Sequence, residues 1–222
     1  MNRAALFDVD GTLADTNHLH VTCWWEALRQ AGHDVAMHDI HRAIGLPGED
    51  LLAHLLGEDR DVSADETVSA AHDTLYGTYF DRLPRLDSAD ELLRALDGRG
   101  WRVVLVTSAK DSELEALRRA IGADDAIAAT ATSDDVSEGK PAPDPVRHAL
   151  RLVDAPARGA VLVGDTVWDM KAGSRAGVSC VGLLCGGIPR HDLEEAGARA
   201  VYRHPADLLA HLGSSPFAHV GA

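Results

Sequence analysis

The sequence has few cysteines, few lysines and no long apolar run. Its 222 residues include three cysteines, Cys23, Cys180 and Cys185. An odd number at irregular spacing provides neither a disulfide framework nor a zinc-binding pattern. Each cysteine lies among apolar neighbours, so we expect buried free thiols and a protein of the reducing cytoplasm.

Positive charge is also scarce. The chain has 21 Lys and Arg residues against 35 Asp and Glu residues, which gives a net charge of -14. This balance argues against nucleic-acid binding and against a polybasic membrane anchor. The least polar long stretch, residues 177–188, contains four glycines and is too short to span a bilayer. We therefore expect neither a nucleic-acid partner nor a membrane partner.

Short apolar runs alternate with helical patterns along most of the chain. The runs cover residues 4–9, 101–106, 126–132, 160–163 and 178–184. The helical patterns between them cover residues 88–99, 111–121, 144–152 and 168–176. Continuous apolar runs of this length are typical of strands that are buried on both faces. The alternation predicts an α/β fold with a doubly wound parallel sheet.

The segment that follows the first predicted strand breaks this rhythm. It lacks a convincing strand, and its apolar residues recur at helical spacing. We predict a small helical domain at residues 16–83, inserted into a core formed by residues 1–15 and 84–222. Such an insertion often forms a lid over a site. The small and polar residues 213–222 predict a flexible tail.

Polar residues stand where the predicted strands end. They are carboxylates, hydroxyls and one lysine, namely Asp8, Asp10, Thr107, Ser108, Lys140, Asp165 and Asp169. Ligands of an open α/β sheet bind outside the carboxyl ends of its strands, so we expect these groups to meet at one edge. Taken singly, each has a structural explanation as a turn, a helix cap or a surface lysine. Together they favour a site for a hard divalent cation beside a phosphate.

Four segments in this order resemble the motifs of the haloacid dehalogenase superfamily. They are FDVDGTLADT, VTSAK, GKPAPDP and LVGDTVWDM. The resemblance extends to about residue 212 and implies a Rossmann-like core, with the helical insertion as the family's cap. Within the superfamily, the chain is most similar to phosphoglycolate phosphatase-like members and to sugar-phosphate phosphatases or β-phosphoglucomutases.

The resemblance implies a role for each motif residue. Asp8 matches the nucleophile that forms an aspartyl-phosphate, and Asp10 matches the general acid and base. A Mg²⁺ cofactor is implied, held by Asp8, Asp165 and the backbone carbonyl of Asp10. Asp169 matches a position that supports the metal directly or through water.

The second and third motifs imply a phosphate-binding group. Thr107 and Lys140 match residues that hold the transferring phosphoryl oxygens. Backbone N–H groups near Ser108 complete that cradle. The implied substrate is a small phosphorylated metabolite, and either a monomer or a homodimer is compatible with this kind of cap.

This chain differs from the dehalogenase, phosphonatase and mutase members of the superfamily, and the differences reduce the number of reactions that it could catalyse. Dehalogenase members lack the second aspartate of the first motif, whereas this chain has Asp10. Phosphonatase members need a cap lysine, and no lysine lies between Asp15 and Pro84. Mutases usually carry Glu-Asp in the fourth motif, whereas Gly164 precedes Asp165 here, as in the phosphatases. A phosphatase is therefore favoured, with a phosphosugar mutase and a non-catalytic phosphometabolite-binding module as alternatives.

Several residues around the cap are candidates for substrate contact. The loop at residues 44–47, with Gly45 and Leu46, resembles the specificity loop of related caps, although it could simply connect two helices. Arg42 could pair with a substrate carboxylate or second phosphate, or lie in solvent. His20 lies at the predicted hinge, whereas most other cap histidines are expected at the surface. Lys110 follows the second motif and could face either the site or solvent.

Overall fold

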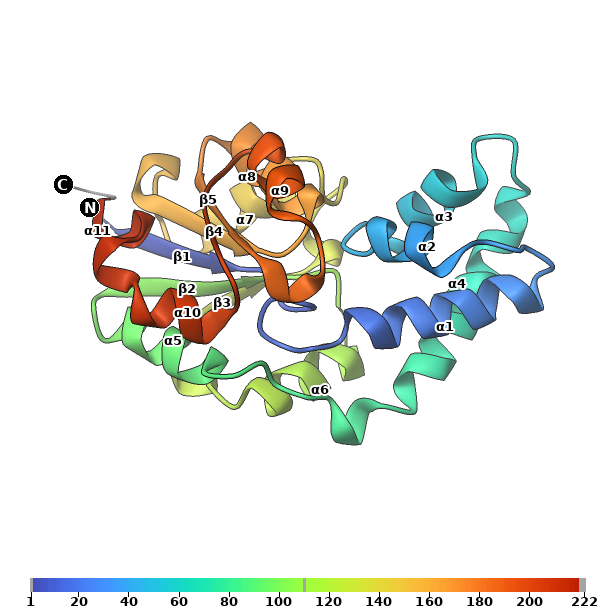
Figure 1. Cartoon of the computed structure of the whole chain (residues 1–222), viewed down its shortest axis with the longest axis horizontal. Helices are drawn as coiled ribbons and strands as arrows, with labels where there is room; N and C mark the ends of the chain where they lie inside the picture. Colours follow the sequence, from blue (N-terminus) through green and yellow to red (C-terminus); the bar gives the residue numbers. More distant parts are fainter. Residues whose placement is uncertain (1, 110, 220–222) are drawn as a thin grey trace.

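The computed structural model describes residues 2–109 and 111–219. Within them, one parallel sheet has six strands in the order β3-β2-β1-β4-β5-β6 (Figure 1). The strands are β1 (Arg3–Phe7), β2 (Trp101–Val106), β3 (Ile127–Ala131), β4 (Ala160–Gly164), β5 (Ser179–Leu183) and β6 (Ala198–Tyr202). The predicted α/β class with a parallel sheet is confirmed.

The edge strand β6 was not predicted from the sequence. Its second residue, Arg199, is exposed, and only Val201 among its five residues is buried. A strand at the edge of a sheet is covered incompletely, so it lacks the continuous apolar run by which the other strands are recognised.

Helices cover both faces of the sheet, as a doubly wound fold requires (Figure 1). Ala5 and Phe7 of β1 pack on one face with apolar residues of α5, α6, α10 and α11. Ala4 and Leu6 point to the other face, where they join residues of α7, α8 and α9. This alternation follows from the two-residue repeat of a strand. The helices are α5 (Ala89–Asp97), α6 (Asp111–Ile121), α7 (Asp144–Leu152), α8 (Val167–Ala176), α9 (Arg190–Ala196), α10 (Pro205–Ala210) and α11 (Pro216–His219).

Four helices between β1 and β2 form the inserted segment, which we call the cap. They are α1 (Asn17–Gln30), α2 (Met37–Ala43), α3 (Gly48–Leu56) and α4 (Asp65–Gly77). They enclose an apolar core of their own, which includes Trp24, Leu28 and Leu52. The two connections to the sheet lie side by side, because Asp15 N–H donates to the Pro84 carbonyl at 2.9 Å. In Figure 1 the cap lies beyond the carboxyl end of β1.

The C-terminal segment departs from the expected flexible tail over its described residues. Residues 216–219 form the short helix α11. Phe217 is buried, and its ring packs edge-on against Trp101 with the ring centroids 4.9 Å apart. An aromatic side chain that finds such a partner is enough to hold a short segment on the core. Among the described residues, no helix combines the length and apolar character that crossing a membrane requires.

Candidate active site

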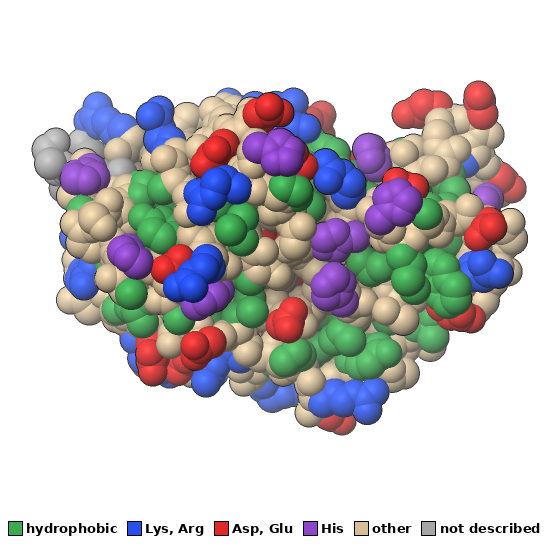
Figure 2. All heavy atoms as spheres, in the orientation of Figure 1, with side chains coloured by type: hydrophobic (Ala, Val, Ile, Leu, Met, Phe, Trp, Pro, Cys, Tyr) green, Lys and Arg blue, Asp and Glu red, His purple; other side chains and the backbone are tan. Residues whose placement is uncertain are grey.

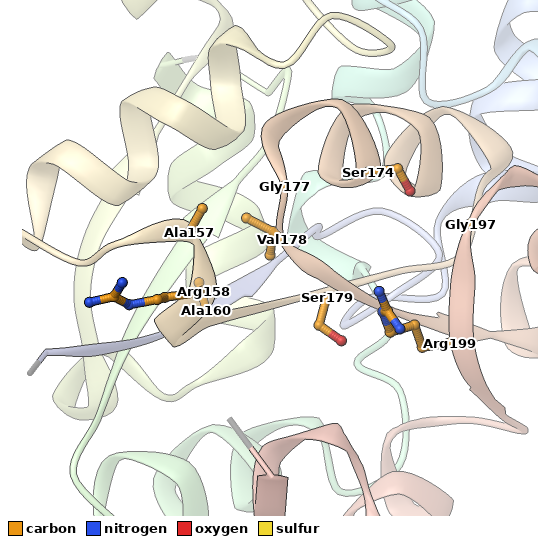
Figure 3. Close-up of a pocket in the computed structure, with 9 residues that line it drawn as sticks. All are labelled: Ala157, Arg158, Ala160, Ser174, Gly177, Val178, Ser179, Gly197 and Arg199. Atoms are coloured by element: carbon orange, nitrogen blue, oxygen red, sulfur yellow. The ribbon is translucent and has the colours of Figure 1, made fainter. Parts of the chain in front are cut away.

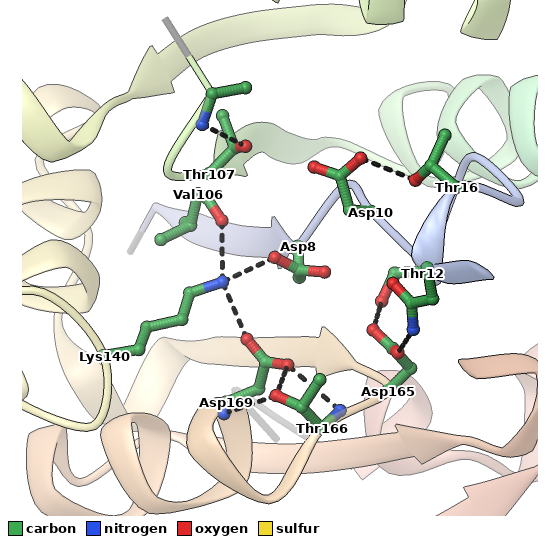
Figure 4. Close-up of polar contacts among 12 residues, drawn as sticks. Asp8, Asp10, Thr12, Thr16, Val106, Thr107, Lys140, Asp165, Thr166 and Asp169 are labelled. Carbon is green, nitrogen blue, oxygen red and sulfur yellow. Dashed lines mark hydrogen bonds and ion pairs between the residues drawn. The ribbon is translucent and has the colours of Figure 1, made fainter. Parts of the chain in front are cut away.

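Lys140 contacts two carboxylates and the last residue of β2, beyond the carboxyl ends of β1, β2 and β4 (Figure 4). Its ammonium donates to Asp8 Oδ1 at 2.5 Å and to the carbonyl of Val106 at 3.0 Å, and it lies 2.7 Å from Asp169 Oδ1. Lys140 is only 6% exposed, and burial alone would favour its neutral form. The two carboxylates outweigh burial and raise the pKa of Lys140 above its usual range. The lysine therefore remains charged among the acids.

Asp165 lies at the end of β4 and is completely buried. Thr12 Oγ1 donates to its Oδ1 and Asn17 Nδ2 donates to its Oδ2, both at 2.8 Å. Burial, followed by the nearby charge of Asp8, raises the pKa of Asp165 well above its usual range. The carboxyl is thus fixed in position, but its ionised form needs a further positive charge.

Asp8, Asp165 and Asp169 form a carboxylate cluster that can hold a cation. One oxygen atom from each lies within 4.8 Å of the others, and all three residues are buried. Burial is the main reason why the pKa of Asp8 rises to about 7. Three carboxylates against the single ammonium of Lys140 leave two negative charges when all are ionised. Oxygen donors and this charge fit a divalent ion such as Mg²⁺.

Asp10 lies beside this cluster but turns its side chain toward the cap. Its Oδ1 accepts from Thr16 Oγ1 at 2.6 Å and lies 3.2 Å from His20 Nε2. Glu113 Oε1 is 3.8 Å from the same imidazole nitrogen. Burial would raise the pKa of Asp10, but the hydrogen bond and charge of His20 lower it overall. Burial, followed by the charge of Asp10, raises the pKa of Glu113 to about 7.

Glycines allow the backbone to approach the clustered carboxylates. A Cβ on Gly186 would lie 2.5 Å from Asp165 Cγ and closer still to its Oδ2. A Cβ on Gly164 would lie 2.5 Å from both Cβ and Cγ of Asp169. Any side chain at these two positions would therefore collide with a carboxylate.

The loop at residues 44–47 closes over the predicted phosphate-binding residues. Thr107, Ser108 and Lys140 line a cavity of about 20 Å³ together with Gly45 and Pro47 of the loop. A cavity of that size has room for about one water molecule. The structure therefore shows the cap closed against the core.

Three residues that the sequence proposed for substrate contact, two of the cap and one of the core, have other surroundings or are not described. The Leu46 side chain is buried in the apolar core of the cap instead of lining the cavity. The Arg42 guanidinium pairs at the surface with Asp192 of α9 at 2.7 Å, because α2 packs alongside that part of the core. Lys110 lies outside the described residues.

Histidines gather where the cap meets the core in the space-filling view (Figure 2). His41 of α2 lies with Nε2 2.7 Å from the carbonyl oxygen of Gly186, and its ring stacks on His18. His72 is an exception to the expectation that most cap histidines lie at the surface. It is buried because it packs on Trp24 within the cap.

Two residues that donate hydrogen bonds to Asp165 were not predicted from the sequence. Thr12 lies inside the first motif, four positions after Asp8, so its place in that motif was an available signal. Asn17 bonds to a residue 148 positions away, and nothing in the local sequence connects the two. Such a pair depends on how the cap folds back on the core.

A second, larger cavity lies away from these carboxylates. It measures about 530 Å³ and is lined by small residues with two arginines, Arg158 and Arg199 (Figure 3). Ala160 and Ser179 in its wall are the first residues of β4 and β5. The cavity therefore lies at the amino ends of these strands, whereas Asp8 lies at the carboxyl end of the sheet. The clustered carboxylates, and not the larger cavity, therefore define the candidate active site.

Comparisons with known proteins find relatives that match most of the chain. A family model described as haloacid dehalogenase-like hydrolase matches residues 2–177. The validoxylamine A 7'-phosphate phosphatase of Streptomyces hygroscopicus subsp. limoneus is 29% identical over 224 residues, which cover 100% of this chain and 99% of the relative.

Solved structures share the fold. A hydrolase from Pseudomonas syringae is 36% identical with a TM-score of 0.90, covering 95% of this chain and 98% of that one. The β-phosphoglucomutase of Clostridium difficile has a TM-score of 0.81 at 17% identity and covers 94% of this chain and 93% of its own. At that identity the likeness to the mutase concerns the fold alone.

Proposed function

The chain belongs to the haloacid dehalogenase-like hydrolases, and from this premise we propose that it is a Mg²⁺-dependent phosphatase that acts through an aspartyl-phosphate. The membership confirms the resemblance inferred from the four motifs. The observation that carries the proposal is the buried cluster of Asp8, Asp165 and Asp169 around Lys140. It combines a carboxylate nucleophile, oxygen ligands for a cation and a positive charge for phosphate.

Asp8 is the proposed nucleophile. An Asp8 oxygen attacks phosphorus, and the bond from phosphorus to the substrate oxygen breaks with its electron pair on that oxygen. Lys140 stands 2.5 Å from Asp8 Oδ1, so its charge reduces the repulsion between the two anions. Mg²⁺ held by Asp8, Asp165 and the backbone carbonyl of Asp10, with Asp169 in support, would neutralise the remaining negative charge.

Asp10 is the proposed general acid and base. It protonates the leaving oxygen, then takes a proton from the water that attacks the aspartyl-phosphate. That attack breaks the bond between phosphorus and Asp8 and releases inorganic phosphate. The contact with His20 and the bond from Thr16 hold the Asp10 carboxyl at the hinge between core and cap.

The substrate proposed is a small phosphate monoester, such as a sugar phosphate or phosphoglycolate. The closed cavity of about 20 Å³ beside Thr107, Ser108 and Lys140 is too small for such a molecule. The cap must therefore open to admit it, and closure then excludes bulk water. Gly45 and Pro47 of the cap line this cavity and are the first candidates for substrate contact.

A phosphate-release assay tests this function. The panel contains glycerol 3-phosphate, phosphoglycolate, hexose phosphates, nucleoside monophosphates, pyrophosphate and 4-nitrophenyl phosphate, each with Mg²⁺ or EDTA. We expect release that needs Mg²⁺ and disappears in Asp8→Asn. Asp97→Asn, the same change at an exposed helix end, is the matched control and should retain wild-type activity.

Two results would contradict the proposal. Full activity of Asp8→Asn would exclude the aspartyl-phosphate. No release from any compound, followed by conversion of β-glucose 1-phosphate in the presence of the bisphosphate, would identify a mutase instead.

A further inference from the structure

Two buried histidines connect Asp10 to the surface of the cap. His20 Nε2 lies 3.2 Å from Asp10 Oδ1, and His20 Nδ1 lies 3.1 Å from His72 Nε2. His72 Nδ1 lies 2.9 Å from Oδ1 of Asp73, whose side chain is 74% exposed. The four side chains form one hydrogen-bonded row that begins in the core and ends in solvent.

Aromatic rings hold both imidazoles in their planes. The Trp24 ring stacks on His72 with a centroid separation of 4.2 Å, and the Tyr76 ring stacks on His20 at 3.9 Å. Each helix thus supplies one histidine and one aromatic residue four positions further on, which places both on the same helix face. Rotation of either imidazole would break a stack and a hydrogen bond together.

The row also determines which nitrogen of each ring carries hydrogen. A carboxylate only accepts, so the contact with Asp73 puts a hydrogen on Nδ1 of His72. Burial lowers the pKa of His72 and favours its neutral ring, whose Nε2 is then an acceptor. His20 must therefore donate from Nδ1 to His72, which leaves its Nε2 facing Asp10.

We propose that His72, held in one tautomer by Asp73, is a positioning residue that orients His20 against Asp10 during proton transfer to the leaving group. This inference rests on the proposed function, in which Asp10 is the general acid. His20 and Thr16 both contact Oδ1 of Asp10. A carboxyl fixed in this way presents its second oxygen, Oδ2, to the leaving oxygen of the substrate.

Leaving-group dependence separates this role from a purely structural one. An alkyl oxygen needs protonation as it departs, whereas 4-nitrophenolate leaves without it. The value of kcat/KM covers the steps up to release of the leaving group. Loss of positioning at Asp10 should therefore lower kcat/KM for an alkyl phosphate much more than for 4-nitrophenyl phosphate.

Four variants of the full chain test the proposal with the fastest alkyl phosphate of the panel and with 4-nitrophenyl phosphate. His72→Leu removes the hydrogen-bond acceptor, whereas His72→Gln supplies an amide oxygen near the position of Nε2. Asp73→Ala removes the exposed carboxylate that fixes the tautomer of His72. Glu66→Ala removes another exposed carboxylate of α4 and is the matched control.

A general acid contributes roughly 10²- to 10⁴-fold to the rate. We therefore expect His72→Leu to lower kcat/KM by at least about tenfold for the alkyl phosphate and by less than about twofold for 4-nitrophenyl phosphate. Asp73→Ala should lower kcat/KM for the alkyl phosphate by about threefold, which is a small part of the general acid's contribution. His72→Gln should retain most of the kcat/KM that His72→Leu loses with the alkyl phosphate. Glu66→Ala should change kcat/KM for neither substrate. Equal losses with both substrates, or unchanged alkyl rates in both His72→Leu and Asp73→Ala, would overturn the proposal.

Imidazole ¹⁵N NMR provides a readout that requires no turnover. We expect hydrogen on Nδ1 of both His20 and His72 in the wild type, and a mixture of tautomers for His72 in Asp73→Ala. Hydrogen on Nε2 of His72 in the wild type would overturn the inference. Activity that persists in Asp8→Asn would overturn the proposed function instead, and the tautomer result would be unaffected.

Discussion

Replacing Gly186 by alanine would place a methyl group against the carboxylate of Asp165. The new Cβ would lie 2.5 Å from Cγ and 2.6 Å from Cβ of Asp165. Nonbonded carbon atoms normally approach to about 3.5–4.0 Å, so one of the two groups must move by roughly 1 Å. The Gly186 backbone is itself held, because its carbonyl accepts from Asn17 Nδ2 at 3.3 Å and lies 2.7 Å from His41 Nε2.

Movement of the Asp165 carboxylate has two costs. Its hydrogen bonds from Thr12 and Asn17 are 2.8 Å long, and a displacement of about 1 Å breaks or weakens both. Bonds to a charged group are worth about 1.5–3 kcal/mol each. A metal ligand must also stay within roughly 0.2 Å of its proper distance, so Mg²⁺ affinity should fall by about 10- to 100-fold.

A Mg²⁺ titration of phosphatase activity measures this loss. The Mg²⁺ concentration for half-maximal activity should rise in Gly186→Ala, and Mg²⁺ should raise the Tm less than in the wild type. Gly77→Ala is the matched control, because a Cβ at Gly77 meets nothing within 4 Å. An unchanged Mg²⁺ requirement in Gly186→Ala would contradict the expected displacement of a metal-binding Asp165 carboxylate.

Further perturbations test other parts of the molecule. Asn17→Ala removes one bond to Asp165 and should raise the Mg²⁺ requirement about tenfold, the low end for an outer-shell partner, in the same titration. EDTA should lower the Tm, because the buried carboxylates lose the positive charge that balances them. A Tm that changes neither on chelation nor on readdition of Mg²⁺ would contradict a metal at the cluster. His41→Phe removes the contact with Gly186 and should raise KM more than it lowers kcat, which steady-state kinetics would detect. Phe217→Ala should lower the free energy of unfolding by about 3 kcal/mol in urea denaturation at unchanged kcat/KM.

The sequence predicted those features that depend on local pattern and topology. Four continuous apolar runs and one alanine-rich run correspond to β1–β5, and the polar residues after them meet because parallel strands end at one edge. Asp8 and Lys140 are 132 positions apart, yet each could be placed from its own motif. The approach of Asp8 and Asp165 follows from the parallel pairing of β1 with β4, because both residues come directly after these strands.

Features that depend on how the cap packs could not be predicted in this way. Asn17 and Asp165 come together only after the cap folds back on the core. The ion pair between Arg42 and Asp192 likewise depends on where α2 settles. Burial of His72 follows from the pairing of α1 with α4, and one histidine among many gives no local sign of it.

The same packing joins cap closure to the carboxylate cluster. Asn17 begins α1, and it donates both to Asp165 and to the carbonyl of Gly186. His41 of α2 contacts that same carbonyl. When the cap opens, α2 must withdraw His41 from Gly186, whereas Asn17 stands next to the hinge and has less far to move. In the proposed open state Asp165 therefore keeps its bonds from Thr12 and Asn17, and closure would add a better-fixed Gly186 beside it.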